Sequence, residues 1–136
     1  MSRANATASG PAFGTATPER ALESIVAGIN AGDLESLMAL YERDAAFATQ
    51  PGSLAPGAAG IREALNGFIA MKGTLELEVT RVLEVDDLAL VIGVWSFEGT
   101  GPDGEPVRLE ARNADVLRRQ TDGNWRFVID NPWGVD

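Results

Sequence analysis

The sequence predicts an α+β fold with an antiparallel sheet, and two observations support that class. Apolar residues recur with a helical period through much of the first half of the chain and with a period of two after Gly73. The alternating segments are also joined in sequence by short turns, such as 101–104 and 121–124, which favour hairpins. Helices kept apart from consecutive hairpins are typical of the α+β class, and the predicted order of elements is ααβαββββ.

Two helices begin the predicted domain. Thr17 is the expected N-cap of the first helix, Pro18 occupies its first helical position, and Gly32 is its stop signal. Asp33 caps the second helix, whose apolar stripe reaches Tyr41. We therefore expect Tyr41 to lie on a helix, packed in the core with its hydroxyl at the edge.

The remaining elements are a strand, a third helix and four consecutive strands. The first strand is predicted over 44–50 and is followed by a loop over 51–57, after which the third helix extends to Gly73. The segment 88–99 is nearly all apolar, which predicts a central strand that is covered on both faces. The four strands after the third helix are predicted over 75–85, 88–99, 106–119 and 125–131.

Composition excludes more chemistry than any motif suggests. The 136 residues include no histidine and no cysteine, which rules out imidazole bases, thiolate nucleophiles, disulfides and His- or Cys-ligated metals. Most of the aspartates lie at expected caps and turns, and the sequence has neither a calcium-loop pattern nor a glycine-rich phosphate motif. We expect no metal and no cofactor, so any catalysis depends on carboxyl, hydroxyl, amide or guanidinium groups.

The charge of the chain limits its partners. A net charge of −9 argues against nucleic acid and anionic membranes, because both are bound through an excess of Lys and Arg. Arg118, Arg119 and Arg126 form the only local basic cluster. This cluster is either a solvated or subunit-facing patch or a site for the phosphate or carboxylate of a ligand.

The first residues differ in composition from the rest. Residues 1–17 consist mainly of Ala, Thr, Ser and Gly, and they lack the apolar run of a signal peptide. This composition predicts a disordered tail on a cytoplasmic protein, followed by a single domain over 18–136.

The most informative anomaly lies in the strand predicted over 106–119. Its core-facing parity begins with Val107 and Leu109 but then places Asn113 and Asp115 among apolar residues. A buried carboxylate is costly unless it is paired or protonated. Either a bulge turns Asp115 to solvent, or Asp115 lines a polar pocket, and the sequence leaves both alternatives open.

Other candidate site residues lie near the ends of strands. Asn131 and Trp133 share the parity of the apolar residues of the last strand, whereas Asp130 faces the other way and is expected to be a surface salt-bridge partner. Thr49 either rims an opening or is a plain strand-end residue. Trp95 and Phe97 share one parity within their predicted strand, and both are either ordinary core residues or part of an aromatic wall for an apolar ligand.

Three phrases of the sequence, LMALYERDAAF (37–47), GIREA (60–64) and DGNWR (122–126), combine with the order of elements. Together they resemble the NTF2-like superfamily, in particular its SnoaL-like and DUF4440 (ketosteroid isomerase-like) members. The resemblance covers about residues 18–134. It implies a cone, in which a curved antiparallel sheet wraps around three helices and encloses an apolar pocket, and a homodimer that forms through the sheet.

The resemblance also relates individual positions to two types of enzyme. Ketosteroid isomerases combine a base on the first strand with an oxyanion hole of a Tyr and a protonated Asp. Here these positions correspond to Thr49, Ile25 and Asp115, so only the acid is present. Limonene-epoxide-hydrolase-like members use an Arg-x-Asp pair and a further Asp on the next strand, and these positions become Asn113-x-Asp115 and Asn131.

We therefore expect a small dimeric domain that binds an apolar or aromatic small molecule. Asp115 is the expected acid or base, assisted by Asn113, in a cofactor-independent isomerase, cyclase or lyase that acts at a carbonyl. The alternative is a non-catalytic dimerisation or partner-binding domain whose pocket is filled by its own side chains. The expected pocket residues are Phe47, Trp95, Phe97, Leu117, Phe127 and Trp133 as walls, with Thr49 and Asn131 as polar contacts.

Overall fold

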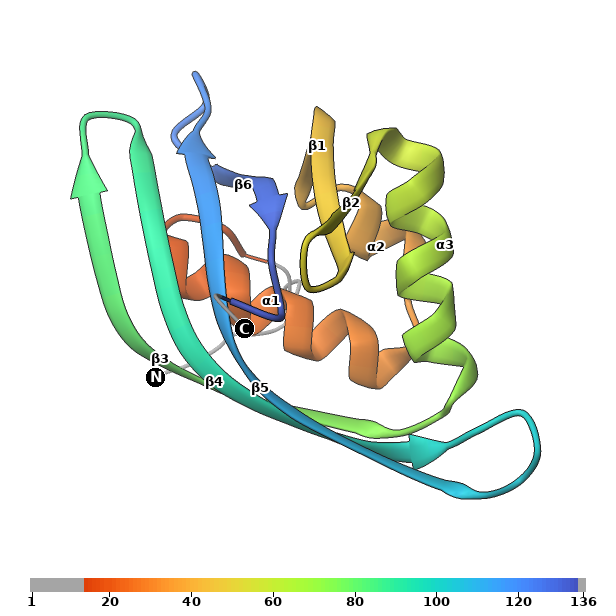
Figure 1. The fold of residues 1–136 in the computed structure, drawn as a ribbon. Helices are drawn as coiled ribbons and strands as arrows, with labels where there is room; N and C mark the ends of the chain where they lie inside the picture. Colours follow the sequence, from red (N-terminus) through yellow and green to blue (C-terminus); the bar gives the residue numbers. More distant parts are fainter. Residues whose placement is uncertain (1–13, 135–136) are drawn as a thin grey trace.

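The computed structural model describes residues 14–134 and confirms the predicted α+β class (Figure 1). Three helices lie on the inner side of a curved, six-stranded sheet. The elements are α1 (Pro18–Ala31), α2 (Leu34–Met38), β1 (Tyr41–Gln50), β2 (Ser53–Pro56), α3 (Gly57–Ala70), β3 (Thr74–Val85), β4 (Leu88–Thr100), β5 (Pro106–Arg119) and β6 (Trp125–Asp130).

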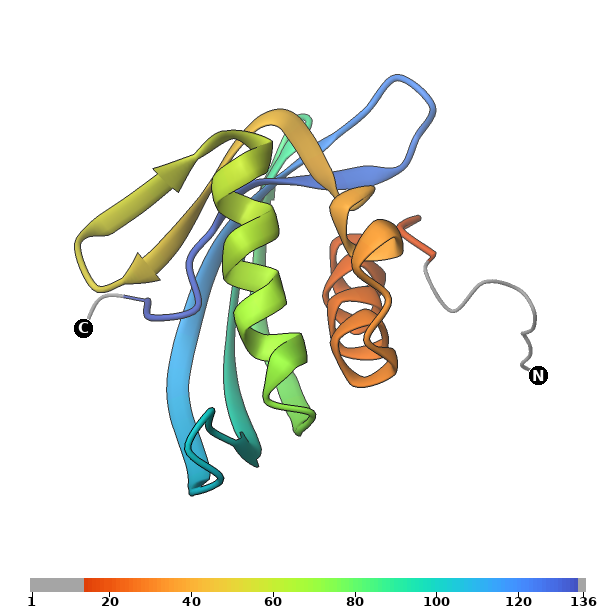
Figure 2. The same ribbon diagram turned by 90° about the vertical axis from the view of Figure 1, so that its right-hand side faces the viewer.

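The strand order of the sheet is β2-β1-β6-β5-β4-β3. All neighbouring strands are antiparallel except β1 and β6, which pair in parallel. Strand β2 corrects the prediction of a plain loop over 51–57, because the chain reverses at Pro51-Gly52 and pairs again with β1. The long strands β3, β4 and β5 bend together around α1, while α3 packs beside β1, as Figure 2 shows from the side.

The first helix forms as its capping residues predict, but the second is shorter than expected. The Thr17 hydroxyl accepts a hydrogen bond from the Arg20 backbone N–H, and Gly32 ends α1 in the left-handed conformation. The prediction that Tyr41 is helical was wrong, because Tyr41 is the first residue of β1. The carbonyl of Leu40 accepts the Phe127 N–H at 2.8 Å, which draws the chain into the sheet.

The two faces of the sheet differ in burial. On the inner face of β4, Val91, Trp95 and Phe97 are buried against the helices. Its outer face is only partly buried, and Val94 there is 39% exposed. The expectation that 88–99 is covered on both faces is therefore corrected within the described chain: the outer apolar residues of this strand have no helix packed on them.

Most of the tail predicted over 1–17 lies outside the described residues. The last residues of that segment contact the domain, since the Trp125 backbone N–H donates to the Thr15 carbonyl at 2.8 Å. No helix within residues 14–134 is long and apolar enough to cross a membrane.

Candidate functional site: a buried carboxyl pair

Asp115 and Asn113 both lie on the inner face of the sheet. Strand β5 pairs with β4 without interruption, so Asp115 keeps the parity of the fully buried Leu117. Asp115 is 1% exposed and Asn113 is 2% exposed. Of the two alternatives open from the sequence, the structure therefore has Asp115 on the pocket side rather than turned to solvent by a bulge.

A second carboxyl group, that of Asp130, joins Asp115 because of an irregularity in β6. Leu117 pairs with Phe127, whereas the preceding residue of β5, Val116, pairs with Ile129. One residue of β6, Val128, is therefore extra, and the alternation of inward and outward side chains is reversed after it. Asp130 is consequently turned inward and is 8% exposed, so the expectation of a surface salt bridge was wrong.

Specific donors hold the two carboxyl groups. The Asn113 amide donates to Asp115 Oδ2 at 2.8 Å, and the Asn131 backbone N–H donates to Asp115 Oδ1 at 2.7 Å. The Tyr41 hydroxyl donates to Asp130 Oδ2 at 2.5 Å. These bonds connect three strands, β1, β5 and β6, at one point of the inner face.

The two carboxyl groups do not titrate as ordinary aspartates. Burial raises the pKa of Asp115 well above its ordinary value, and the negative charge of Asp130 raises it further. Burial also raises the pKa of Asp130, to about 6, although its hydrogen bonds with Tyr41 and Asp115 oppose this shift. Because each carboxyl group influences the ionisation of the other, their titration steps belong to the pair and not to either residue alone.

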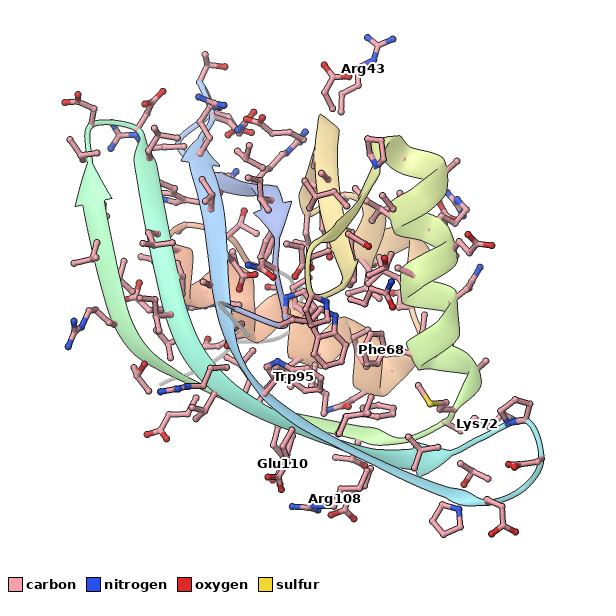
Figure 3. All side chains as sticks on the ribbon, in the orientation of Figure 1. Arg43, Phe68, Lys72, Trp95, Arg108 and Glu110 are labelled. Atoms are coloured by element: carbon pink, nitrogen blue, oxygen red, sulfur yellow. The ribbon has the colours of Figure 1, made fainter. Side chains whose placement is uncertain are left out.

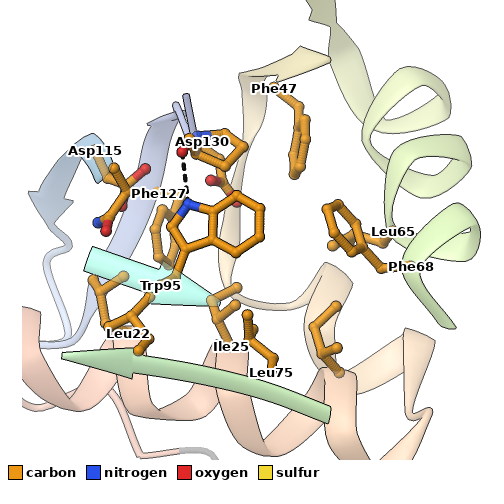
Figure 4. Close-up of a pocket in the computed structure, with 14 residues that line it drawn as sticks. Leu22, Ile25, Phe47, Leu65, Phe68, Leu75, Trp95, Asp115, Phe127 and Asp130 are labelled. Atoms are coloured by element: carbon orange, nitrogen blue, oxygen red, sulfur yellow. Dashed lines mark hydrogen bonds between the residues drawn. The ribbon is translucent and has the colours of Figure 1, made fainter. Parts of the chain in front are cut away.

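The pair lies beside an apolar pocket with a free volume of about 50 Å³ (Figure 4). Asp115 and Asp130 are the only charged residues that line it within the described chain. The apolar side chains come from α1, α3, β1, β3, β4 and β6, so the helices and the curved sheet both contribute. The lining residues are Leu22, Ile25, Ile29, Phe47, Leu65, Phe68, Leu75, Leu77, Trp95, Asn113, Asp115, Phe127, Asp130 and Pro132.

Aromatic side chains and the C-terminal segment narrow the pocket. Trp95 Nε1 donates to the Pro132 carbonyl at 2.6 Å, which ties the chain after β6 to the middle of β4. Figure 3 shows Phe68 and Trp95 approaching each other from α3 and the sheet, and their rings meet edge to face at 6.2 Å. Trp133 also packs against Trp95, at 5.6 Å between ring centroids.

The structure brings some predicted pocket residues together and separates others. Phe47, Trp95 and Phe127 line the pocket with Asn113 and Asp115, whereas Phe97 and Leu117 are completely buried behind it. Thr49 is exposed, and Trp133 touches Trp95 without lining the cavity. Asn131 reaches the site through its backbone, because its side-chain amide donates to the Gly134 carbonyl. The roles of all these residues in ligand binding stay predictions.

Three important residues were not found by sequence reasoning. Asp130 was missed because strict alternation was assumed, although the run Phe127-Val128-Ile129 already departs from an alternating pattern and is compatible with a bulge. Tyr41 was placed on the wrong element. Phe68 was recognised only as part of a helical apolar face, and nothing in the sequence shows that this face meets Trp95.

The basic cluster and the acidic residues do not form further sites. Arg118 pairs with Glu42 at 2.9 Å, and the Arg119 guanidinium lies over the Trp125 ring. None of the three arginines of the cluster lines the pocket. Within residues 14–134 there is no group of three or more acidic side chains that could hold a metal ion.

A family model described as a SnoaL-like domain matches residues 22–128. Comparison with curated protein sequences gives no match. Similar folds occur among solved structures. A ketosteroid isomerase-like protein from Erwinia carotovora atroseptica has a TM-score of 0.71 and 18% identity, over 82% of this chain and 88% of that one.

Two further solved structures carry different provisional names. A protein from Novosphingobium aromaticivorans, provisionally named a scytalone dehydratase, has a TM-score of 0.73 and 19% identity, over 83% of this chain and 78% of that one. A protein from Thiobacillus denitrificans, provisionally named a calcium/calmodulin-dependent protein kinase type II association domain, has a TM-score of 0.69 and 23% identity, over 89% of this chain and 95% of that one. Likeness at this level of identity establishes the fold alone.

Proposed function

This chain belongs to the SnoaL-like domain family, and from that premise we propose that it is a cofactor-independent acid–base enzyme for a small, apolar carbonyl compound. The observation that carries the proposal is the buried pair Asp115–Asp130 at an apolar pocket. Carboxyl groups whose pKa values are raised toward neutrality are suited to proton transfer at physiological pH. The reaction class is isomerisation, cyclisation or elimination through an enol intermediate.

The pair contains both partners that such a reaction needs. Its protonated carboxyl group donates to the carbonyl oxygen of the substrate, while its ionised carboxylate accepts a proton from the carbon next to that carbonyl. The substrate becomes an enol and the pair is left with one proton, so charge and protons balance. Transfer of that proton to another carbon, with return of the enol O–H proton to the pair, gives an isomer. Transfer of that proton to a β-hydroxyl, which leaves as water while the enol O–H proton returns to the pair, gives an elimination product.

Asn113 and Asn131 act on this chemistry through Asp115. The Asn113 amide and the Asn131 backbone N–H are both directed at the Asp115 carboxyl group. They fix its orientation, and they stabilise it when it is ionised. In this geometry Asn113 is a positioning residue, rather than a direct donor to the substrate.

The charge of the pocket favours an uncharged substrate. The pair is negative near neutral pH, and no Lys or Arg lines the cavity in the described chain. A carboxylate or phosphate on the ligand would therefore be repelled without a cation to neutralise it. An alicyclic or aromatic ketone, enone or hydroxyketone fits these conditions.

Substrate binding requires the aromatic walls to move. Sites for drug-sized ligands enclose roughly 300–1,000 Å³, whereas the free volume here is about 50 Å³, room for only a few water molecules. Phe68 and Trp95, together with the segment that holds Pro132, narrow the pocket. Rotation of Phe68, which is only half-buried, is the simplest way to enlarge it.

The names of several structural neighbours are compatible with a reaction that moves protons next to a carbonyl group. The neighbours include a ketosteroid isomerase-like protein and proteins provisionally named dehydratases, and both reactions move protons next to an oxygen function. These activities belong to those proteins. They support the reaction class proposed here and do not identify a substrate.

A second candidate function is a non-catalytic dimerisation or partner-binding domain. The observation that favours it is the small free volume, which is what a pocket filled by its own side chains would have. The neighbour provisionally named an association domain adds weight to this alternative. In that case, the raised pKa values of the carboxyl pair would be a cost of the fold without a catalytic use.

We also propose that the chain forms a homodimer through the outer face of its sheet. The outer apolar residues of β3 and β4 include Leu83 and Val85, which are 52% and 65% exposed, and Val94, which is 39% exposed. Their neighbours Leu88, Leu90 and Ile92 are only half-buried. Exposed apolar surface of this kind is typical of an interface between subunits.

Deuterium exchange tests the acid–base function without knowledge of the natural substrate. A set of uncharged cyclic ketones and enones is incubated with the protein in D₂O, and the loss of the ¹H NMR signal next to the carbonyl is followed. We expect protein-dependent exchange for at least one compound and a decrease of roughly 100-fold or more in Asp115→Asn. Asp44→Asn removes an exposed carboxyl group and serves as the matched control. Absence of exchange throughout, or exchange unaffected by Asp115→Asn, contradicts the proposal.

A further inference from the structure

We propose that Tyr41 is a positioning residue that keeps the Asp115–Asp130 pair at one shared proton, instead of two, by donating its hydroxyl group to Asp130. This inference deepens the proposed function and rests on it, because it explains how the pair stays competent both to give and to accept a proton. Asp130 itself belongs to the same assignment, since Tyr41 reaches the site only through it.

The geometry fixes the Tyr41 hydroxyl on Asp130. Tyr41 begins β1 and is paired with Phe127 in the parallel register of β1 and β6. Its ring packs against the Phe127 ring at 5.3 Å, and only 5% of the residue is exposed. The hydroxyl lies 2.5 Å from Asp130 Oδ2. A buried ring held in this way has one orientation, so the hydrogen bond does not depend on a mobile side chain.

Tyr41 acts on the pair without touching the pocket. It is not among the residues that line the cavity, whereas Asp130 is. A phenol that donates to a carboxylate stabilises the ionised form and disfavours a second proton on the pair. Burial raises the pKa of Asp130, whereas the hydrogen bond from Tyr41 lowers it. The Tyr41 hydroxyl therefore lowers the pH at which the pair takes up a second proton.

In the described chain, no charged group other than the two aspartates themselves lines the pocket and could shift the ionisation of the pair. The elements packed around the pair are α1, α3, β3 and β4, and their side chains at the pocket are all uncharged. The groups that face the pair are Tyr41 on β1, Asp115 with Asn113 on β5, and Asp130 on β6. Burial and the two carboxylates raise the pKa of Tyr41 well above 10, so the phenol remains a donor throughout the range in which the pair titrates.

The first test compares the titration of the carboxyl carbons in the wild-type protein and in Tyr41→Phe, with ¹³C-labelled aspartate and NMR. Tyr41→Phe removes one oxygen and keeps the ring. We expect the midpoint for ionisation of the pair to rise by about one to two pH units, because hydrogen bonds to charged groups contribute that much. Ser24→Ala removes another buried hydroxyl group, one that donates to the Gly14 carbonyl, and is expected to leave this midpoint unchanged.

The second test uses the fact that Tyr41 is the only tyrosine of the chain. The absorbance of tyrosinate near 295 nm therefore reports this residue alone. We expect its midpoint in the wild-type protein to lie well above 10 and to fall in Asp130→Asn, since that variant removes the negative charge and the carboxylate acceptor. This measurement decides the matter if Tyr41→Phe does not fold.

The outcomes separate this inference from the proposed function. If the pair titrates near pH 4 in the wild-type protein, the acid–base proposal itself fails. If its midpoints are raised but the same in Tyr41→Phe and the wild type, the pair remains a candidate catalyst and only the role of Tyr41 is overturned. With Tyr41→Phe unfolded, a Tyr41 midpoint that is equal in the wild type and Asp130→Asn also overturns it.

Discussion

Asp115 and Asp130 each occupy an inward position that the rest of the inner face gives to apolar side chains. Each is stabilised there by specific donors: the Asn113 amide and the Asn131 backbone N–H for Asp115, and the Tyr41 hydroxyl for Asp130. In a chain without histidine, such a pair is the structural means of bringing a proton-transfer group toward neutral pH. Its burial is expected to reduce stability, as is common for functional sites.

Asp115→Asn should therefore stabilise the protein, and more so at pH 8 than at pH 5. Because the pKa values of the pair are raised in the folded protein, ionisation of the pair as the pH rises is less favourable there than in the unfolded chain. The stability of the wild type thus declines as the pH rises above the unfolded pKa of about 3.9. We expect the variant to gain on the order of 5 °C in melting temperature at pH 8.

Thermal denaturation at several pH values measures this effect. Asp44→Asn, which neutralises an exposed carboxyl group, is the control and should show little change at any pH. Equal or lower stability of Asp115→Asn at pH 8 would contradict a raised pKa in the folded protein.

The alternation of side chains along β5 and β6 explains why the sequence predicted the position of Asp115 but not that of Asp130. Asp115 was found because uninterrupted pairing between β4 and β5 preserves alternation, so its parity in the sequence is its parity in space. Asp130 was not found because the extra residue Val128 reverses parity only at the end of β6. A bulge depends on the pairing of two strands, and no single strand carries enough information to place it.

At the scale of elements, Gly93 allows β3, β4 and β5 to lie close together beside Asn113. Gly93 of β4 lies opposite Asn113 of β5 and Val79 of β3. A Cβ atom at Gly93 would lie 2.6 Å from the Glu78 carbonyl oxygen and 2.9 Å from Asn113 Oδ1. Glycine is therefore required here by space, because backbone fills the position that a methyl group would take.

Gly93→Ala should destabilise the protein by about 1–3 kcal/mol, since the ladder between β3 and β4 has to move to admit the methyl group. Urea denaturation measures the change. Gly67→Ala is the matched control: no atom lies within 4 Å of its Cβ position in α3, and we expect a gain of about 0.5–1 kcal/mol from the helix preference of alanine. Wild-type stability of Gly93→Ala would show that the close contact is not present in solution.

The elements themselves were largely predictable. The strands from β3 to β6 and the first and third helices lie where periodicity and turn residues indicate, because those signals are local. The exceptions are the short helix α2, the strand β2 and the start of β1 at Tyr41. The end of α2 and the start of β1 are decided by pairing with β6, a strand distant in sequence, which local patterns do not encode. Strand β2 instead pairs with its sequence neighbour β1 across the turn at Pro51-Gly52.

At the scale of the whole molecule, both faces of the curved sheet carry apolar side chains, but only the inner face is covered by helices. The inner face encloses the core and the pocket against α1 and α3. The outer face carries exposed apolar side chains on β3 and β4, and its most exposed members are Leu83 and Val85. The resemblance that predicted the cone also implied a dimer through the sheet, and the exposed apolar residues are a physical reason to propose the outer face as its interface.

Leu83→Glu combined with Val85→Glu should shift the protein from dimer to monomer, because two buried carboxylates at an interface are not compensated. Size-exclusion chromatography with light scattering measures the mass, and circular dichroism verifies the fold. Leu54→Glu alters a side chain that is 59% exposed on β2, away from this face, and should leave the dimer intact. A monomeric wild-type protein would exclude the proposed interface.

We propose that Asp115 and Asp130 share a proton in an apolar pocket, and a pH titration of their carboxyl ¹³C signals in the wild-type protein provides a direct test. We expect both groups to titrate well above the ordinary value of about 3.9, with the pKa of Asp130 near 6 and that of Asp115 also raised by burial. We also expect each signal to respond to the titration of its neighbour. Two independent midpoints near 4 would show that the two aspartates do not share a proton.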